Sequence, residues 1–382
     1  MNNPTPIASI KKFLASKDFD LARKRLLDLI YDTSDLNKIK EGIAWSKSYY
    51  SKDHLPIPDD AWEKRAHELL ESLEGFSFKE SKHKLLAEAK GVSKAYKAGK
   101  FALKKIDFSI NSGEIVGIVG ENGNGKTTFL RHLAGELNQD SGSIDYSYYP
   151  VEVNYFYSLK QHTGFIPQRI PKWFGKLRDN LEFTAAIHGI KGEENQITVD
   201  FILERFGLSK FQNLTWNQIS SGYRTRFEVA RIVLLRPKLL VLDEPLANLD
   251  INAQQTLLQD LRFIAKSQAH PMGVLLTSQQ LYEVEKVADR VLFIQNGIGK
   301  YNSELKQKEN EMLFVELETK ADRELILKSL GNEAASIKFN GGVYQIEFKG
   351  STDECLSKLV QNKVDIQYFR NITESTKRFF AN

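Results

Sequence analysis

The sequence contains a single cysteine, Cys355, in 382 residues. One thiol cannot form an internal disulfide, so we expect the chain to work in a reducing compartment. The sequence also lacks any run of the roughly 18–20 apolar residues needed to cross a bilayer. Its opening segment, MNNPTPIASIKKF, has neither the charged start nor the unbroken apolar core of a signal peptide. We therefore expect a soluble, cytoplasmic protein that cannot form a membrane pore by itself.

Strong charge of either sign is missing as well. The formal net charge is +4, and no Lys/Arg block dominates any segment. A surplus this small is typical of a solvated surface, so we expect no nucleic-acid partner. The apolar fraction of 41% and the charged fraction of 27% are those of an ordinary globular protein. The length is enough for two or three domains with buried cores.

The first region, residues 1–75, is predicted to be a helical extension. Apolar residues recur at helical spacing through its first 30 positions, and Asp59 or Asp60 is expected to cap a later helix that carries Trp62. Two interpretations stay open for this region. It is either an ordinary helical packing domain or an adaptor module that binds an unknown protein.

Two further regions follow a short linker. In residues 85–300, apolar segments such as EIVGIVG, KLLVLDEP and GVLLTS alternate with helical patterns, which predicts an α/β domain. Residues 311–382 have the pattern of a small α+β domain with the order βαββαβ, the ferredoxin-like split arrangement. A hairpin at Gly341-Gly342 supports that order, and the segment TESTKRFF is expected to form a short end helix.

A glycine-rich loop is the most informative motif. The segment GENGNGKT, at 120–127, matches G-x-x-x-x-G-K-[ST] between a predicted strand and a predicted helix, which is the context of a phosphate-binding loop. Its glycines allow successive N–H groups to converge on phosphate oxygens, and the following helix adds its dipole. The predicted nucleotide-binding residues here are Gly120, Glu121, Asn122, Gly123, Asn124, Gly125, Lys126, Thr127 and Thr128.

An acidic pair completes the predicted phosphate site. Asp243 ends the strand LLVLD, where a carboxylate can meet Mg²⁺ held by the Thr127 hydroxyl. Glu244 comes next, and we expect it to polarise the attacking water.

Together with these two motifs, the sequence from 85 to 300 resembles the ATP-binding subunits of ABC transporters. The resemblance assigns Tyr96 in VSKAY to stacking on adenine and Gln168 in GFIPQ to sensing the metal. The segment NQISSGYRTR, at 217–226, matches the signature motif, so Ser220 and Gly222 are expected to contact the γ-phosphate held by an opposite subunit. Asp250 in LANLD is expected at the dimer interface.

The resemblance implies ATP and Mg²⁺ as cofactors and a homodimer, or a pair with a similar subunit, closed around two ATP molecules. It also implies a separate integral membrane permease, which would hold the protein on the inner face of the cell membrane. A groove near Gln168, with Trp173 and Phe174 exposed, is expected to receive it. A C-terminal extension of this size is typical of exporter subunits, where it regulates or stabilises the dimer; a plain packing role is the alternative.

Three positions depart from the family pattern, and one of them is Tyr223, which stands where glutamine is common although other residues occur there. Ser221 stands where the first glycine of the signature is usual, and Gln279 follows GVLLTS where histidine is usual. Glutamine can donate a hydrogen bond but carries no positive charge. We therefore assign Glu244 and Gln279 as catalytic residues and expect slow ATP hydrolysis; the alternative is ordinary turnover with an accepted variant.

The sequence thus predicts the motor of an ABC transporter. A soluble ABC ATPase that acts as an assembly factor or switch without a pore is the alternative. A catalytically dead scaffold fits least, because Lys126, Asp243 and Glu244 are all present.

Overall fold

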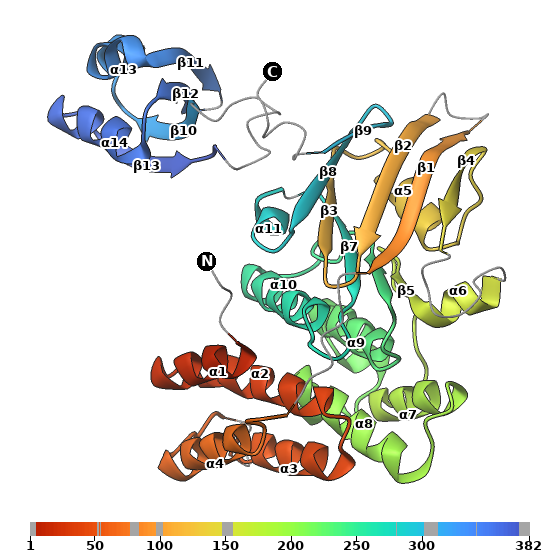
Figure 1. Ribbon diagram of the computed structural model, residues 1–382. Helices are drawn as coiled ribbons and strands as arrows, with labels where there is room; N and C mark the ends of the chain where they lie inside the picture. Colours follow the sequence, from red (N-terminus) through yellow and green to blue (C-terminus); the bar gives the residue numbers. More distant parts are fainter. Residues whose placement is uncertain are drawn as a thin grey trace.

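The structure is a computed structural model that describes residues 5–51, 53, 55–76, 84–96, 102–146, 156–279, 281–301, 312–340 and 342–373. Its element order follows the three predicted regions (Figure 1). The predicted end helix TESTKRFF and the hairpin residue Gly341 lie outside the described residues, apart from Thr373.

Four helices form the N-terminal region: α1 (Pro6–Ala15), α2 (Phe19–Asp32), α3 (Leu36–Lys47) and α4 (Asp60–Glu71). A side-chain oxygen caps each of them, because the first N–H groups of a helix lack intrahelical partners. The cap of α4 is Asp59, whose carboxylate accepts from the Trp62 N–H at 2.8 Å. Of the two predicted caps, Asp59 is therefore confirmed.

The middle region contains two sheets. Its parallel sheet has the order β5-β6-β7-β3-β8-β9, with only β9 antiparallel to its neighbour, and a smaller antiparallel sheet has the order β2-β1-β4. The strands are β1 (Leu85–Ala95), β2 (Ala102–Asn111), β3 (Ile115–Val119), β4 (Ser141–Asp145), β5 (Thr163–Ile166), β6 (Leu239–Leu242), β7 (Gly273–Ser278), β8 (Arg290–Gln295) and β9 (Ile298–Tyr301). The helices are α5 (Lys126–Leu133), α6 (Phe156–His162), α7 (Leu177–Ile187), α8 (Gly192–Arg205), α9 (Ser221–Val233), α10 (Ile251–Ala265) and α11 (Leu281–Glu285).

Strand β3 lies between β7 and β8 in the parallel sheet and is buried on both faces. Successive side chains of a strand point to opposite faces. Accordingly, Ile115 and Val119 belong to the core that contains the large helices, whereas Val116 and Ile118 belong to the core shared with α5 and the antiparallel sheet. The predicted α/β domain is confirmed, and the phosphate loop leaves the carboxyl end of its central strand.

The N-terminal helices share a core with this middle region. Leu26, Ile30 and Trp62 lie in the same cluster of buried side chains as Phe201 of α8 and Leu261 of α10. Tyr31 of α2 stacks on Phe201 with ring centroids 3.9 Å apart. Packing of this kind joins the N-terminal helices to the face of the middle region formed by α8 and α10.

A buried ion-pair cluster lies inside this contact. The Arg205 guanidinium at the end of α8 donates to both Asp28 oxygens, at 2.6 and 3.1 Å, and to Asp260 Oδ1 at 2.7 Å. Arg23 Nη1 donates to Ser46 Oγ at 2.8 Å and to Glu204 Oε1 at 3.2 Å. Both arginine side chains are 1% exposed. Charges this deeply buried are tolerated only when they are paired.

The C-terminal region is a four-stranded antiparallel sheet with the order β11-β12-β10-β13 and two helices. Its elements are β10 (Met312–Thr319), α13 (Arg323–Leu330), β11 (Ala334–Asn340), β12 (Val343–Lys349), α14 (Thr352–Gln361) and β13 (Ile366–Asn371). The predicted βαββαβ order is confirmed. Cys355 of α14 is fully buried in the core of this region, and burial raises the pKa of its thiol to about 11.

No helix in the described ranges combines the length and the apolar character needed to cross a bilayer.

Candidate ATP site

The glycine-rich loop connects β3 to α5 and depends on backbone angles that favour glycine. Gly123 and Gly125 have φ angles of 79° and 102°, in the left-handed region that other residues rarely adopt. A Cβ on Gly120 would lie 2.2 Å from the Ile294 carbonyl oxygen, which is backbone and cannot move aside cheaply. The loop is therefore built so that its N–H groups and the start of α5 can surround a phosphate.

Lys126 and Thr127 extend from the first turn of α5. The Lys126 ammonium is 5% exposed; it donates to the carbonyl oxygens of Gly120 at 2.7 Å and Glu121 at 3.1 Å, and lies 3.7 Å from Glu244 Oε1. The Thr127 hydroxyl donates to Asp243 Oδ1 at 3.1 Å. Two motifs more than a hundred residues apart in the sequence thus meet at one point.

Asp243 follows the last residue of β6, beside this loop, and is 4% exposed. Burial raises the pKa of its carboxyl, and hydrogen bonds from the Thr277 and Thr127 hydroxyls offset part of that rise. Thr277 of β7 donates to Asp243 Oδ1 at 2.8 Å and accepts from the Glu244 N–H at 2.7 Å. Sequence reasoning missed Thr277, although a polar residue at the end of the apolar strand GVLLTS was a usable signal.

Glu244 is the point where several polar side chains converge. Its Oε2 accepts from Gln168 Nε2 and from Gln279 Nε2, each at 2.9 Å. The residue has a φ of 48°, so the chain turns sharply after β6, and the carboxylate faces the phosphate loop instead of continuing the strand. Gln279, which stands where the resemblance expects histidine, is thus in direct contact with the proposed catalytic carboxylate.

Ser220, Gly222 and Asp250 lie elsewhere on the chain. They line a cavity of about 240 Å³ between the starts of α9 and α10, and no residue of the 120–128 segment lines it. Asp250 also caps α10 through the Ala253 N–H at 2.9 Å, and the Ser221 hydroxyl donates to the Asn248 carbonyl at 3.2 Å. One chain therefore presents the phosphate loop and the signature residues on separate surfaces.

Among the remaining predicted nucleotide-binding residues, only some have side-chain contacts in the structure. Asn124 Oδ1 accepts from the Asn296 N–H at 3.1 Å, whereas Glu121, Asn122 and Thr128 make no side-chain hydrogen bond within the residues described. Tyr96 follows β1 and is 41% exposed. Its stacking on adenine stays a prediction.

The expectation that Trp173 is exposed holds only in part, because its side chain is half-buried. Its indole donates to Glu228 Oε2 at 3.0 Å and lies under the Arg231 guanidinium, 4.6 Å away, so it folds back onto α9. Phe174 is 80% exposed, as predicted. Trp173 has a hydrogen-bonding ring N–H that Phe174 lacks, and that group finds its partner inside the protein.

The chain is similar in sequence and in fold to known proteins. The family model for ABC transporters matches residues 103–247. An ABC transporter ATP-binding protein of Streptomyces coelicolor is 30% identical over 212 residues, which cover 55% of this chain and 79% of the relative. The energy-coupling factor transporter ATP-binding protein EcfA1 of Latilactobacillus sakei is 30% identical over 202 residues, which cover 52% of this chain and 71% of the relative.

The chain belongs to the ABC transporter ATP-binding proteins. Members of this family bind ATP and energise a membrane permease. A solved structure of CbiO1 from Clostridium perfringens, part of the ABC transporter complex CbiONQ, shares the fold with a TM-score of 0.51 and 24% identity. That match covers 59% of this chain and 92% of the CbiO1 chain.

The donor set of this ABC protein fits Mg²⁺. Thr127, Asp243 and Gln168 offer hydroxyl, carboxylate and amide oxygens, the hard ligands that Mg²⁺ prefers. Over the ranges that the structure describes, no three His, Cys, Asp or Glu side chains form a group able to hold a metal alone. Such a site suits an ion that takes its other ligands from nucleotide phosphates and water.

Proposed function

We propose that the protein is a Mg²⁺-dependent ATP hydrolase that works as a homodimer. The observation that carries this proposal is the separation of two half-sites on one chain: Lys126, Asp243 and Glu244 meet at the phosphate loop, while Ser220 and Gly222 line another surface. Two copies facing head to tail would bring each loop against the signature residues of the other copy. Such an arrangement is isologous and closed, as expected for a C2 dimer.

The loop side of each site would bind and polarise the phosphates. The Lys126 ammonium would leave the Gly120 and Glu121 carbonyls to pair with the β- and γ-phosphates. Mg²⁺, held by Thr127 and Asp243 with Gln168 nearby, would supply positive charge at the phosphate oxygens. Glu244 would accept a proton from the attacking water.

Gln279 would hold Glu244 in place through its 2.9 Å hydrogen bond, but it brings no positive charge to the γ-phosphate. Loss of one preorganised electrostatic contact typically costs on the order of 10²–10³ in rate. We therefore propose that ATP binding and dimer closure are intact and that the chemical step is slow.

Single-turnover hydrolysis of ATP by the purified protein tests this proposal, together with its mass in solution with and without ATP and Mg²⁺. Wild type should dimerise on ATP and hydrolyse it slowly. Glu244→Gln should give a stable dimer without hydrolysis, and Gln279→His should raise the rate at unchanged dimerisation. A wild-type protein that stays monomeric with ATP, or that hydrolyses ATP no faster than Glu244→Gln, contradicts it.

The permease would dock on an exposed apolar patch formed by Phe174, Phe183 and Ile187. These side chains are 80%, 64% and 61% exposed, and the last two are four residues apart on α7, so they share one face. The Phe174 carbonyl accepts from Asn180 Nδ2 at 2.8 Å, which ties the loop to α7. Grouped exposed apolar side chains favour an interaction surface over plain solvent exposure.

The exporter assignment and the cytoplasmic position on the membrane rest on the C-terminal region and on the family. With a co-purified permease, Phe183→Ser should lower binding to the permease and leave ATP-dependent dimerisation unchanged. Leu36→Ser is a matched control, since Leu36 is 38% exposed on α3, outside the patch. If Phe183→Ser and Leu36→Ser lower binding to the permease equally, α7 is ruled out as the docking site.

A further inference from the structure

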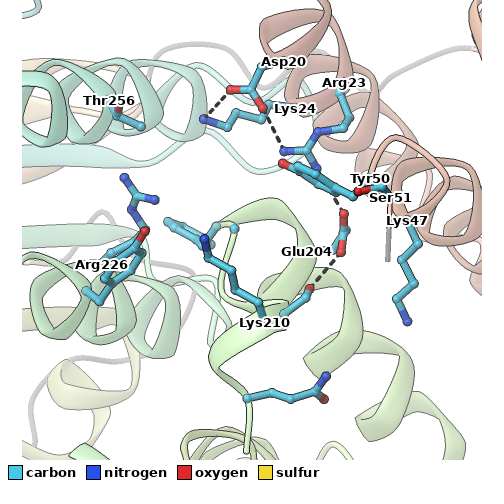
Figure 2. Close-up of a pocket in the computed structure, with 15 residues that line it drawn as sticks. Asp20, Arg23, Lys24, Lys47, Tyr50, Ser51, Glu204, Lys210, Arg226 and Thr256 are labelled. Atoms are coloured by element: carbon cyan, nitrogen blue, oxygen red, sulfur yellow. Dashed lines mark hydrogen bonds and ion pairs between the residues drawn. The ribbon is translucent and has the colours of Figure 1, made fainter. Parts of the chain in front are cut away.

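A large cavity lies between the N-terminal helices and the middle region, away from the phosphate loop. Its volume is about 490 Å³, within the range of about 300–1,000 Å³ that is typical of small-molecule sites. Side chains from α2, from the end of α3 and the segment after it, from the end of α8 and the segment after it, from α9 and from α10 line it. Figure 2 shows Lys24, Lys210 and Arg226 approaching this space from three different elements.

The lining is strongly cationic. Five lysine and arginine side chains line the cavity against two carboxylates, Asp20 and Glu204. Both carboxylates are already engaged. Asp20 pairs with Arg23 at 3.0 Å and with Lys24 at 3.1 Å, and Glu204 accepts from Arg23, Ser46 and Ser209. The cavity therefore has an excess of positive charge that its own acids do not neutralise.

Lys210 and Arg226 carry much of that excess. Lys210 Nζ lies 5.0 Å from the Phe211 ring centroid and the Arg226 guanidinium lies 5.5 Å from the Tyr223 ring centroid. Neither has a carboxylate within 4.0 Å anywhere in the described part of the chain, whereas Lys47 of the same cavity pairs with Asp200 at 3.3 Å. Two cations held against aromatic rings and facing a cavity are arranged to receive an anion.

The cavity also has apolar walls. Tyr50, Phe206 and Tyr223 line it beside the cations. Burial raises the pKa of the Tyr50 phenol, so this side chain carries no negative charge at neutral pH. Aromatic faces combined with a few charged groups are typical of sites that bind a ring bearing an anionic group.

We propose that this cavity binds a small phosphorylated molecule of nucleotide size, with Lys210 and Arg226 on its phosphate and the aromatic wall against its organic part. Arg226 suits phosphate because its planar guanidinium can donate two parallel hydrogen bonds. The Lys24 ammonium also lines the cavity, but Asp20 already pairs with it at 3.1 Å, so Lys210 and Arg226 are the cations available to the phosphate.

This site lies next to the signature residues. Tyr223, Arg226 and Thr256 line both this cavity and the smaller one that contains Ser220 and Gly222. A ligand held by Arg226 thus contacts α9 within two turns of its first residue. The binding itself does not depend on the proposed dimer or on hydrolysis, so it can fail or succeed separately from them.

Calorimetric titration of the full chain with inorganic pyrophosphate and with AMP tests the proposal. The phosphate loop is a competing site, so the titrations are made in a Lys126→Ala background. Pyrophosphate or AMP should bind this protein, and Lys210→Ala or Arg226→Ala should weaken binding at least about tenfold each, the effect of losing one hydrogen bond to a charged group. Tighter binding of AMP than of pyrophosphate would support the role of the aromatic wall.

The matched control is Lys172→Ala, because Lys172 also lies over an aromatic ring, that of Phe174 at 5.6 Å, but outside the cavity. It should leave binding unchanged. Lys210 is exposed, so its substitution should not affect folding. The proposal is overturned if neither probe binds in the Lys126→Ala background. It is also overturned if Lys210→Ala and Arg226→Ala bind the probes as tightly as Lys172→Ala does.

Discussion

Replacing Arg205 by methionine should separate the N-terminal helices from the middle region. Arg205 makes three short hydrogen bonds, two to Asp28 of α2 and one to Asp260 of α10, with its own side chain 1% exposed. The Asp28 and Asp260 side chains are 16% and 3% exposed. Methionine has a similar length but removes the nearest counter-charge of both carboxylates, so that the remaining cations are Arg25, 3.5 Å from Asp28, and Lys24, 3.9 Å from Asp260. Removing one partner of a buried pair costs about 3–5 kcal/mol.

Urea unfolding followed by tryptophan fluorescence measures this cost. Trp45 and Trp62 lie on α3 and α4, so loss of the N-terminal packing changes the signal directly. Arg205→Met should lower the midpoint by the equivalent of about 3–5 kcal/mol. A separate early transition of the N-terminal helices would be a second sign of the same defect.

Arg65→Met is the matched control. Arg65 pairs with Glu68 at 2.8 Å, but its side chain is 49% exposed, and surface pairs of this kind contribute little. The triple variant Arg205→Met, Asp28→Asn, Asp260→Asn should recover part of the loss, because neither carboxylate remains, but not all of it, because Arg25 then loses its Asp28 partner. If Arg205→Met is no more harmful than Arg65→Met, the buried cluster does not hold the two regions together.

Three further outcomes follow from the geometry. Thr277→Val should destabilise the protein by about 1–3 kcal/mol and slow hydrolysis, because Asp243 and the Glu244 N–H both lose a partner. Melting and ATPase assays check this against Thr163→Val, whose buried hydroxyl has no partner among the described residues. Gly120→Ala should abolish ATP binding in a nucleotide-binding assay, since its Cβ would meet the Ile294 carbonyl; Gly123→Ala, with nothing within 4 Å, should be milder. Burial and the charges of Arg236 and Lys238 lower the pKa of His270 to about 4 in the folded protein. Between about pH 6.5 and pH 4 the imidazole is therefore protonated in the unfolded chain but not in the folded one. The free energy of unfolding should fall as the pH is lowered through that range. Urea midpoints across that range, with His270→Gln as the insensitive control, measure the effect.

The phosphate loop and the strands around it could be predicted because their signals are local. Gly120, Lys126 and Thr127 are neighbours in sequence, and β3, β6 and β7 read as short apolar runs. The contact between Thr127 and Asp243 followed from a rule about parallel strands, whose carboxyl ends meet at one edge. For these residues, the local sequence motif and the position at the end of a strand were enough to predict their place in the site.

The packing of the N-terminal helices could not be predicted in the same way. Asp28 and Arg205 are 177 positions apart, and the local sequence around either residue does not predict that the two form an ion pair. Trp173 was expected at the surface as part of a docking contact, and its partner Glu228 lies 55 positions away. Helix α3 was not identified separately, since its apolar positions serve a contact with α8 that only the tertiary fold creates.

The burial of Cys355 has a practical consequence for following this protein in motion. Its thiol is fully buried and has a pKa near 11, so at neutral pH it is almost entirely protonated and shielded from maleimide reagents. A cysteine introduced at Phe174 or Leu36, both exposed, would then be the single reactive thiol per chain. A fluorophore or spin label placed there would report distances between two copies without removal of the native cysteine.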